Sequence, residues 1–269
     1  MSVAAGTGEN FDVGRVLSQV GALIGRNFVP FFVLSLLFAG LPALLIFVIQ
    51  MNMLGANPVE AMQTGAGSPY GLTTFVLFAL VATLPAYVLQ AALTRASIDD
   101  LSGKGVSIGA AIQAGLRYLL PLIGLGIIMS LGIGAALLVF VIPGIILAVC
   151  WIVSSPVLIV EKTGVFQAMQ RSLQLTRNHR WALFGMLVLY IIVFFVINVV
   201  MGLVMGGTMG AFGGTSPALI RPTLVTGVIQ AFVGSFEVML TTVAIAAIYF
   251  ELRRIKDGVG VTELASVFD

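Results

Sequence analysis

The chain has 269 residues, of which 59% are hydrophobic and only 9% are charged, and its mean hydropathy is +1.11. About a quarter of the residues of a soluble globular domain are charged, so this composition excludes a water-soluble protein. Thirteen Lys and Arg residues against eleven Asp and Glu residues give a net charge of +2. Most of the chain must therefore lie in lipid, where roughly 20 consecutive apolar residues make one helical crossing.

Six apolar runs of about that length predict six transmembrane helices. They cover residues 28–50, 72–93, 119–141, 143–160, 181–205 and 223–250, and the fourth is the shortest. The 31 Gly and 10 Pro residues suit membrane helices, in which neighbouring helices satisfy freed backbone groups and small residues allow close approach. The predicted fold class is an all-α integral membrane protein with a single membrane domain over residues 1–269.

A basic, half-apolar segment precedes the first, third and fifth runs. The last of these is VEKTGVFQAMQRSLQLTRNHRW, residues 160–181. Its apolar positions follow helical spacing at Val165, Phe166, Met169, Leu173 and Thr176, and Leu175 falls outside the pattern. We interpret the three segments as amphipathic helices that lie in the interface plane on the cytoplasmic side. The alternative is a cytosolic linker helix that touches no lipid.

Each amphipathic helix is expected to end near a Pro or Trp, at Pro30, Pro121 and Trp181, where the chain turns into the bilayer. The chain then divides into three similar units, residues 11–93, 107–160 and 164–250, each an interfacial helix followed by two spans. Units of the same orientation would be parallel repeats around an axis along the membrane normal.

The positive charges orient the chain, because Lys and Arg concentrate in cytoplasmic loops. Under the six-span interpretation, twelve of the thirteen fall on one side: Arg15, Arg26, Arg95, Lys104, Arg117, Lys162, Arg171, Arg177, Arg180, Arg253, Arg254 and Lys256. Only Arg221 falls on the other side. We therefore expect both termini in the cytoplasm and the protein in the inner, cytoplasmic membrane. In the VIPG turn after the third span, Pro143 is expected to start the next helix and Gly144 to let it bend back; Pro156 should kink that helix.

The stretch from Val141 to Leu187 resembles a known signature. It carries a Pro-Gly turn, an aromatic residue and then a Pro within a span, a Glu at its end and a basic helix running into Arg and Trp. The matching positions are Pro143, Gly144, Trp151, Pro156, Glu161, Gly164, Ala168, Arg171, Ser172, Leu175, Arg180 and Trp181. The sequence is similar here to the glycerophosphoryl diester phosphodiesterase membrane-domain family. Some members join this domain to a catalytic phosphodiesterase, which is not among these residues.

Charged residues at the cytoplasmic end are the first candidate site. The resemblance implies a Glu and an Arg together at Glu161 and Arg171, and we expect an ion pair that pins the interfacial helix to the bundle. The other interfacial cations are predicted to face lipid headgroups or to form ion pairs: Arg15, Arg26, Arg117, Arg177 and Arg180.

Glu237 is the one charge predicted at membrane depth, where an acid costs on the order of 2.5 to 3.5 kcal/mol and usually faces the bundle interior. Asn198 lies at a similar depth on the fifth span, and Gln230 precedes Glu237 on the sixth. The group would form either a polar cavity or proton site, or a neutral hydrogen-bonded acid that joins the fifth and sixth spans.

No catalytic constellation is visible, since the single histidine, His179, stands beside cations. The sequence predicts no enzyme, metal, cofactor or nucleic-acid partner. The first hypothesis is a non-catalytic protein that organises or stabilises the membrane by holding anionic headgroups. The alternative is a transporter or channel with a midplane polar site at Glu237. A lipid-modifying enzyme is a third possibility without a recognisable site, and any homo-oligomer or protein partner stays open.

Overall fold

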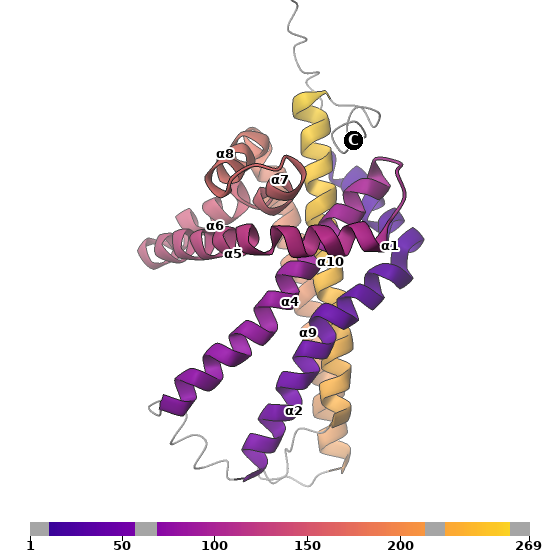
Figure 1. The fold of residues 1–269 in the computed structure, drawn as a ribbon, viewed down its shortest axis with the longest axis vertical. Helices are drawn as coiled ribbons and strands as arrows, with labels where there is room; N and C mark the ends of the chain where they lie inside the picture. The colour runs from indigo at the N-terminus through magenta and orange to yellow at the C-terminus, as the bar shows by residue number, and fades with distance from the viewer. Residues whose placement is uncertain (1–10, 57–68, 213–223, 259–269) are drawn as a thin grey trace, which may run out of the picture. The chain divides into compact units, whose positions relative to one another are not determined.

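The structure is a computed structural model that describes residues 11–56, 69–212 and 224–258. Within these ranges the chain is helical and contains no strand (Figure 1). In chain order the elements are α1 (Val13–Ser35), the π-helical segment η1 (Leu36–Gly40), α2 (Leu41–Ala56), α4 (Pro69–Leu101), α5 (Ile108–Val139), α6 (Val141–Cys150), α7 (Ser154–Val160), α8 (Val165–Thr176), α9 (Arg180–Phe212) and α10 (Leu224–Asp257).

Six stretches of helix are long and apolar enough to cross a membrane. They are Val13–Asn52, Thr73–Leu101, Ile108–Val139, Val141–Val160, Arg180–Leu203 and Leu224–Asp257. Large apolar side chains on them are exposed, as lipid-facing side chains must be; Phe75 and Phe195 are examples. The prediction of an all-α, multi-pass membrane protein is therefore confirmed.

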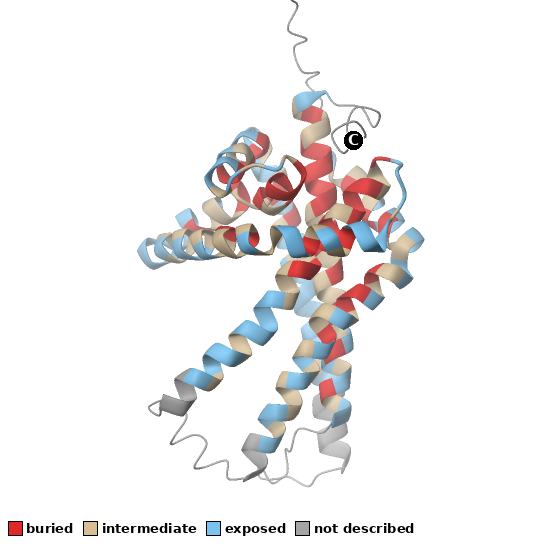
Figure 2. Cartoon of the chain, viewed as in Figure 1, coloured by how far each residue is buried: buried red, intermediate tan, exposed pale blue. Residues whose placement is uncertain are grey.

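The chain forms two compact units, each built from separate segments. Unit 1 comprises residues 1–32, 87–188 and 239–269, and unit 2 comprises residues 33–86 and 189–238. By sequence, unit 1 carries every Lys and Arg except Arg221. Buried residues are dense in α7, α8 and the end of α10, which belong to unit 1 (Figure 2). The three-repeat arrangement stays a prediction.

The first two interfacial segments lie within α1 and α5, which contain Pro30 and Pro121. The predicted helix end at Pro121 is wrong, because α5 continues through it, whereas α1 consists of two helices joined at a kink near Pro30. In α1 the helical backbone is interrupted at Asn27 (φ −120°, ψ 23°), three residues before Pro30. The proline ring clashes with the carbonyl of residue i−4 and removes a hydrogen bond, so the distortion falls in the preceding turn.

Helix α5 crosses α4 within unit 1 at a glycine. A Cβ atom added to Gly115 would lie 2.6 Å from the carbonyl oxygen of Val88 on α4. A side chain there would therefore collide with backbone. At Gly126, three turns later on α5, an added Cβ atom would collide with the hydroxyl of Tyr87. Small residues thus set how closely these two helices approach.

The turn between α5 and α6 consists of one extended residue, Phe140 (φ −156°, ψ 145°). Pro143 lies in the first turn of α6, where a missing N–H costs nothing, as the sequence predicts. Gly144 serves differently from our expectation. Its φ is not positive, and it is buried so close to Leu137 of α5 that a Cβ atom would clash. It acts by allowing close packing rather than by bending the chain.

The predicted fourth span is broken rather than kinked. Helix α6 ends at Cys150 and α7 begins at Ser154, with Pro156 in its first turn. The break leaves the carbonyl of Cys150 without its usual helical donor. The hydroxyl of Ser172, on α8, donates to it at 2.8 Å. The hydroxyl of Thr176, also on α8, lies 3.4 Å from the same oxygen and 2.9 Å from the carbonyl oxygen of Ser172. Because all three groups are buried, the break in one helix fixes the position of another.

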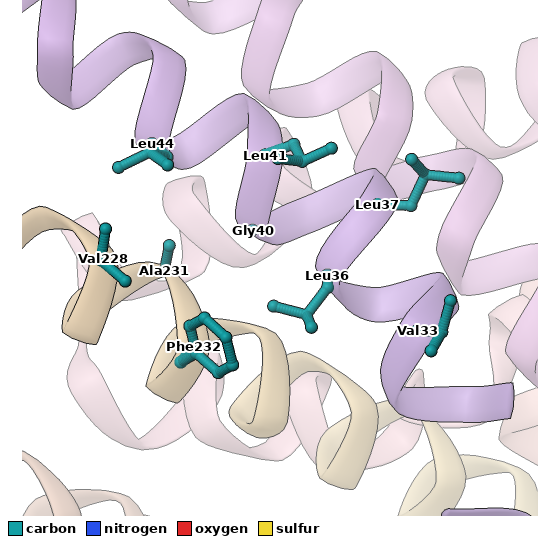
Figure 3. A pocket seen from close by; sticks show the side chains of 9 residues that line it. All are labelled: Val33, Leu36, Leu37, Gly40, Leu41, Leu44, Val228, Ala231 and Phe232. Carbon is teal, nitrogen blue, oxygen red and sulfur yellow. The ribbon is translucent and has the colours of Figure 1, made fainter. Parts of the chain in front are cut away.

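Unit 2 contains a π-helical segment ahead of Pro42. The N–H of Leu41 donates to the carbonyl of Leu36, five residues earlier, and Pro42 itself has no N–H to continue the α-helical pattern. Gly40 ends the segment against α10, where an added Cβ would lie 2.5 Å from Oγ of Ser235. An apolar groove of about 380 Å³ lies beside it, between η1 and residues Val228, Ala231 and Phe232 of α10 (Figure 3).

Candidate functional site

Glu161 joins three helices of unit 1 through its carboxylate. It directly follows α7, and its N–H donates to the carbonyl of Val157. Nε of Arg171, on α8, lies 3.3 and 3.4 Å from its two carboxylate oxygens. The hydroxyl of Tyr249, on α10, donates to Oε1 at 3.1 Å, and that tyrosine is fully buried. The predicted partners Glu161 and Arg171 are thus brought together, with a third residue that the sequence did not reveal.

These interactions close into a ring. Nη2 of Arg171 lies 2.5 Å from Oδ2 of Asp257, the last residue of α10. Nε of Arg253 lies 3.5 Å from the same oxygen, near enough for an ion pair although too poorly aligned for a hydrogen bond. Nη1 of Arg253 donates to the hydroxyl of Tyr249 at 3.3 Å. We call Glu161, Arg171, Tyr249, Arg253 and Asp257 the five-residue ring.

The ring balances two cations against two carboxylates. Burial alone would lower the pKa of Arg171, but the hydrogen bond and charge of Asp257, together with Glu161, outweigh it and raise that pKa above its ordinary value. Arg171 therefore stays charged. Its charge is used within the protein, so it is not available to a lipid headgroup.

A second pair of contacts ties α1 to α10. The carboxylate of Glu251 is fully buried and accepts from Arg254 at 3.0 and 3.1 Å. Nη1 of Arg15 reaches the same carboxylate at 3.3 Å, and Arg15 also lies 3.9 Å from the exposed Asp12. A buried carboxylate without such partners would be costly, so the two arginines offset the burial of Glu251.

The remaining acids of unit 1 that the structure describes are paired as well. Nη2 of Arg26 lies 2.6 Å from Asp100, which joins α1 to α4. Nε of Arg95 lies 2.8 Å from Asp99, one turn away on α4. Of the arginines that the sequence assigns to the interface, Arg15, Arg26 and Arg171 are therefore engaged by protein carboxylates.

The other three predicted interfacial arginines are differently placed. Arg117 lies over the ring of its neighbour Tyr118, 5.9 Å from the centroid. Arg177 and Arg180 are exposed at the turn between α8 and α9. In the part of the chain that the structure describes, none of these three forms an ion pair with a carboxylate.

Helix α8 does not bury the predicted apolar positions alike. Ala168, Ser172, Leu175 and Thr176 are almost fully buried, whereas Phe166 is 67% exposed. Leu175, which falls outside the apolar pattern of the sequence, is thus buried in the protein, and the interfacial position of the helix stays a prediction. The buried hydroxyls of Ser172 and Thr176 contact the carbonyl of Cys150, at the break in the fourth span. Helical periodicity could not reveal these contacts. Trp181, the neighbour of Arg180 in the chain, is also exposed, at 87%.

His179 lies beside Phe11, with ring centroids 6.3 Å apart. Burial, and then the positive charge of Lys256, lower the pKa of His179 below its ordinary value. It is therefore neutral at pH 7 and half-buried, rather than a cation that faces headgroups.

Within unit 2, the intramembrane candidates form a link between two helices. Nδ2 of Asn198, on α9, donates to Oε1 of Glu237, on α10, at 3.2 Å and to the carbonyl of Phe194 at 2.8 Å. Gln230 is exposed two turns before Glu237. The side chains of Asn198, Gln230 and Glu237 do not line the groove beside Gly40. The geometry is that of a polar contact between the fifth and sixth spans.

Sequence reasoning missed Tyr249, Glu251, Arg253 and Asp257. Tyr249, Arg253 and Asp257 are spaced by four residues, which places them on one face of α10, and this was the available signal. Their partners are about 90 residues away in the chain, so no local pattern could identify them.

Among the described residues, no group of three or more His, Cys, Asp or Glu side chains is placed to hold a metal ion.

The chain matches a known protein family over the region that contains the site. The family model described as the membrane domain of glycerophosphoryl diester phosphodiesterase matches residues 126–260, about half of the chain and all of the five-residue ring. No curated protein matches the sequence, and no solved structure matches the fold.

Proposed function

The chain belongs to the family of membrane domains of glycerophosphoryl diester phosphodiesterase, and on that premise we propose that it is a non-catalytic protein that organises the inner membrane by holding anionic lipid headgroups at the cytoplasmic face. The matched family model describes a membrane domain and not a catalytic one. The proposal concerns the charged unit 1, and specifically the surface around α8.

One observation carries the proposal: unit 1 separates its cations into two classes. Arg15, Arg26 and Arg171 are paired with carboxylates, whereas Arg177 and Arg180 are exposed next to exposed aromatic residues. Trp and other aromatic residues are typical of the membrane interface, and each cation near an anionic surface contributes about 1 kcal/mol. A fixed platform with free cations and aromatic side chains suits a layer of anionic headgroups.

The five-residue ring supplies the rigidity that such a platform requires. It anchors α8 to α7 and α10 by charged hydrogen bonds, and the hydroxyls of Ser172 and Thr176 add a buried anchor on the other side. The exposed residues of α8 therefore keep a fixed orientation. In this proposal the charged loops of unit 1 and both termini face the cytoplasm, as the positive-inside bias predicts.

The test is the thermal stability of the full chain in lipid discs. We expect a higher Tm in discs that contain phosphatidylglycerol than in discs of phosphatidylcholine alone, because anionic lipid binds the folded state. The double variant Arg117→Gln/Arg177→Gln should lose part of this difference. Arg221→Gln, which removes the one cation predicted on the opposite face, is the matched control and should keep it. Equal Tm values in both kinds of disc would refute the proposal.

The transporter alternative has less support. Glu237 bonds to Asn198, and this contact accounts for its position without a transported ligand.

A further inference from the structure

A cavity of about 360 Å³ lies in unit 1 between α6 and the first turns of α9. Ile142, Ile145, Ile146 and Val149 form one wall, and Arg180, Trp181 and Phe184 form the other. The four α6 residues follow helical spacing and so present one continuous apolar strip. Arg180 is the one charged residue of the lining.

Described parts of the protein cover the Val149 end of the strip and leave the other end open. Val149 is buried, whereas Ile142 is 71% exposed and Ile146 is 48% exposed; Trp181, on the opposite wall, is 87% exposed. Side chains of this kind at the end of a membrane helix need an apolar neighbour, and in a bilayer that neighbour is a lipid chain. A mainly apolar cavity with one well-placed polar group is also the usual form of a small-molecule site.

Arg180 is held at the edge of the cavity by the turn that precedes α9. Asn178 adopts a left-handed backbone (φ 74°), and this turn ends α8 and places Arg180 as the first residue of α9. No carboxylate among the described residues forms an ion pair with Arg180, whereas Arg26 and Arg171 in the same unit are paired. Its neighbour His179 is neutral at pH 7, because burial and Lys256 lower its pKa. The mouth of the cavity therefore carries one positive charge that the protein does not neutralise.

We propose that this cavity binds one anionic phospholipid of the cytoplasmic leaflet. An acyl chain lies along the isoleucine strip, and the lipid phosphate accepts hydrogen bonds from the guanidinium of Arg180, which suits planar, bidentate phosphate recognition. The indole of Trp181 lies at the level of the headgroup, where amphipathic aromatic rings are most stable. The proposal rests on the membrane face proposed above and adds a single site to it.

Tryptophan fluorescence tests the site directly, because the chain has only two tryptophans, Trp151 and Trp181. In full-length Trp151→Phe protein, Trp181 is the sole tryptophan and reports quenching by lipids brominated on the acyl chain. We expect brominated phosphatidylglycerol to bind about fivefold more tightly than brominated phosphatidylcholine, the ratio for roughly 1 kcal/mol from one cation. Arg180→Gln should remove this preference, and Arg180→Lys should restore part of it.

Lys162→Gln is the matched control, since Lys162 is an exposed cation of the same unit that does not line the cavity. It should keep the preference. Equal loss in Lys162→Gln and Arg180→Gln would show a diffuse surface charge and overturn the site. Equal quenching by the two lipids in the parent protein, or complete loss of the preference on adding inorganic phosphate, would also overturn it. Native mass spectrometry of the unmodified chain provides a second readout should Trp151→Phe fold poorly: it should retain one phosphatidylglycerol that Arg180→Gln lacks.

The two proposals can fail separately. If phosphatidylglycerol raises the Tm of the chain but Arg180→Gln leaves the lipid preference unchanged, the headgroup function stands and the single site is wrong.

Discussion

The hydroxyl of Ser172 lies 2.8 Å from the carbonyl oxygen of Cys150, and both groups are buried. This contact joins α8 to the point at which the fourth span breaks. It shows how the polar residues of an outwardly amphipathic helix can serve the interior instead of the surface. The nearby hydroxyl of Thr176 also approaches the same oxygen, at 3.4 Å.

Removing both hydroxyls should cost more than the sum of the single changes. Ser172→Ala leaves the Cys150 carbonyl with Thr176, so we expect a loss of about 1 kcal/mol. Ser172→Ala combined with Thr176→Val leaves a buried carbonyl without these two donors, which should add about 1 to 3 kcal/mol. Chemical denaturation in detergent measures both. Ser130→Ala is the control, because the Ser130 hydroxyl bonds only within its own helix at an exposed position; a similar loss there would contradict this account.

Glu161→Gln should loosen α8 selectively. The change removes the charge that holds Arg171 and weakens the acceptor used by Tyr249, while Asp257 still engages the arginine. We expect a loss of about 1 kcal/mol, which corresponds to roughly fivefold faster amide hydrogen exchange in α8. Helix α4 should be unaffected. Asp100→Asn, which breaks the separate pair with Arg26, should leave α8 unchanged; unaltered exchange in α8 of Glu161→Gln would remove the ring's anchoring role.

Two acids that share Arg15 allow buried and exposed pairs to be compared. Glu251 is fully buried, and its loss leaves Arg15 and Arg254 without their common partner. We expect Glu251→Ala to destabilise the protein by about 3 kcal/mol. Asp12 is exposed and 3.9 Å away, so Asp12→Ala should cost no more than about 1 kcal/mol. Denaturation midpoints in the same detergent give the comparison, and equal losses would show that burial of Glu251 is unimportant.

His179 should make stability depend on pH in the acidic range. Its pKa in the folded protein is lowered from 6.5, first by burial and then by Lys256, so the unfolded chain binds the proton more readily. Stability is therefore fully present above about pH 6.5 and falls as the pH drops toward the lower folded pKa. His179→Gln should flatten this part of the Tm profile. A variant with the same acid dependence as the parent would assign the effect to other groups.

The sequence predicted the elements governed by local composition and not those governed by distant partners. The six spans and their orientation depend on the transfer of apolar residues into lipid and on the distribution of positive charge. Both are properties of the local sequence, so both could be predicted from it. Glu161 and Arg171 are ten residues apart, and the family resemblance implied that they occur together. Glu251 and Asp257 could not be identified, because nothing in their local sequence indicates that Arg15 or Arg171 will reach them. Pro30 and Pro121 both predicted helix ends, but only Pro30 follows a break in the helical backbone, at Asn27, whereas α5 continues through Pro121.

Glu237→Gln separates the structural role of the intramembrane acid from a transport role. The amide oxygen of Gln can still accept the hydrogen bond that Asn198 donates to Oε1, so the contact between α9 and α10 should persist. We expect an unchanged Tm and no change in proton leak across proteoliposomes. Asn198→Leu is the informative comparison, because it removes the donor and leaves the acid. It should lower the Tm, since we expect the free energy of unfolding to fall by about 1 kcal/mol. A proton leak in the parent protein that Glu237→Gln abolishes would favour the transporter alternative, since only a group that exchanges protons would respond to the loss of its titratable oxygen while the helix contact survives.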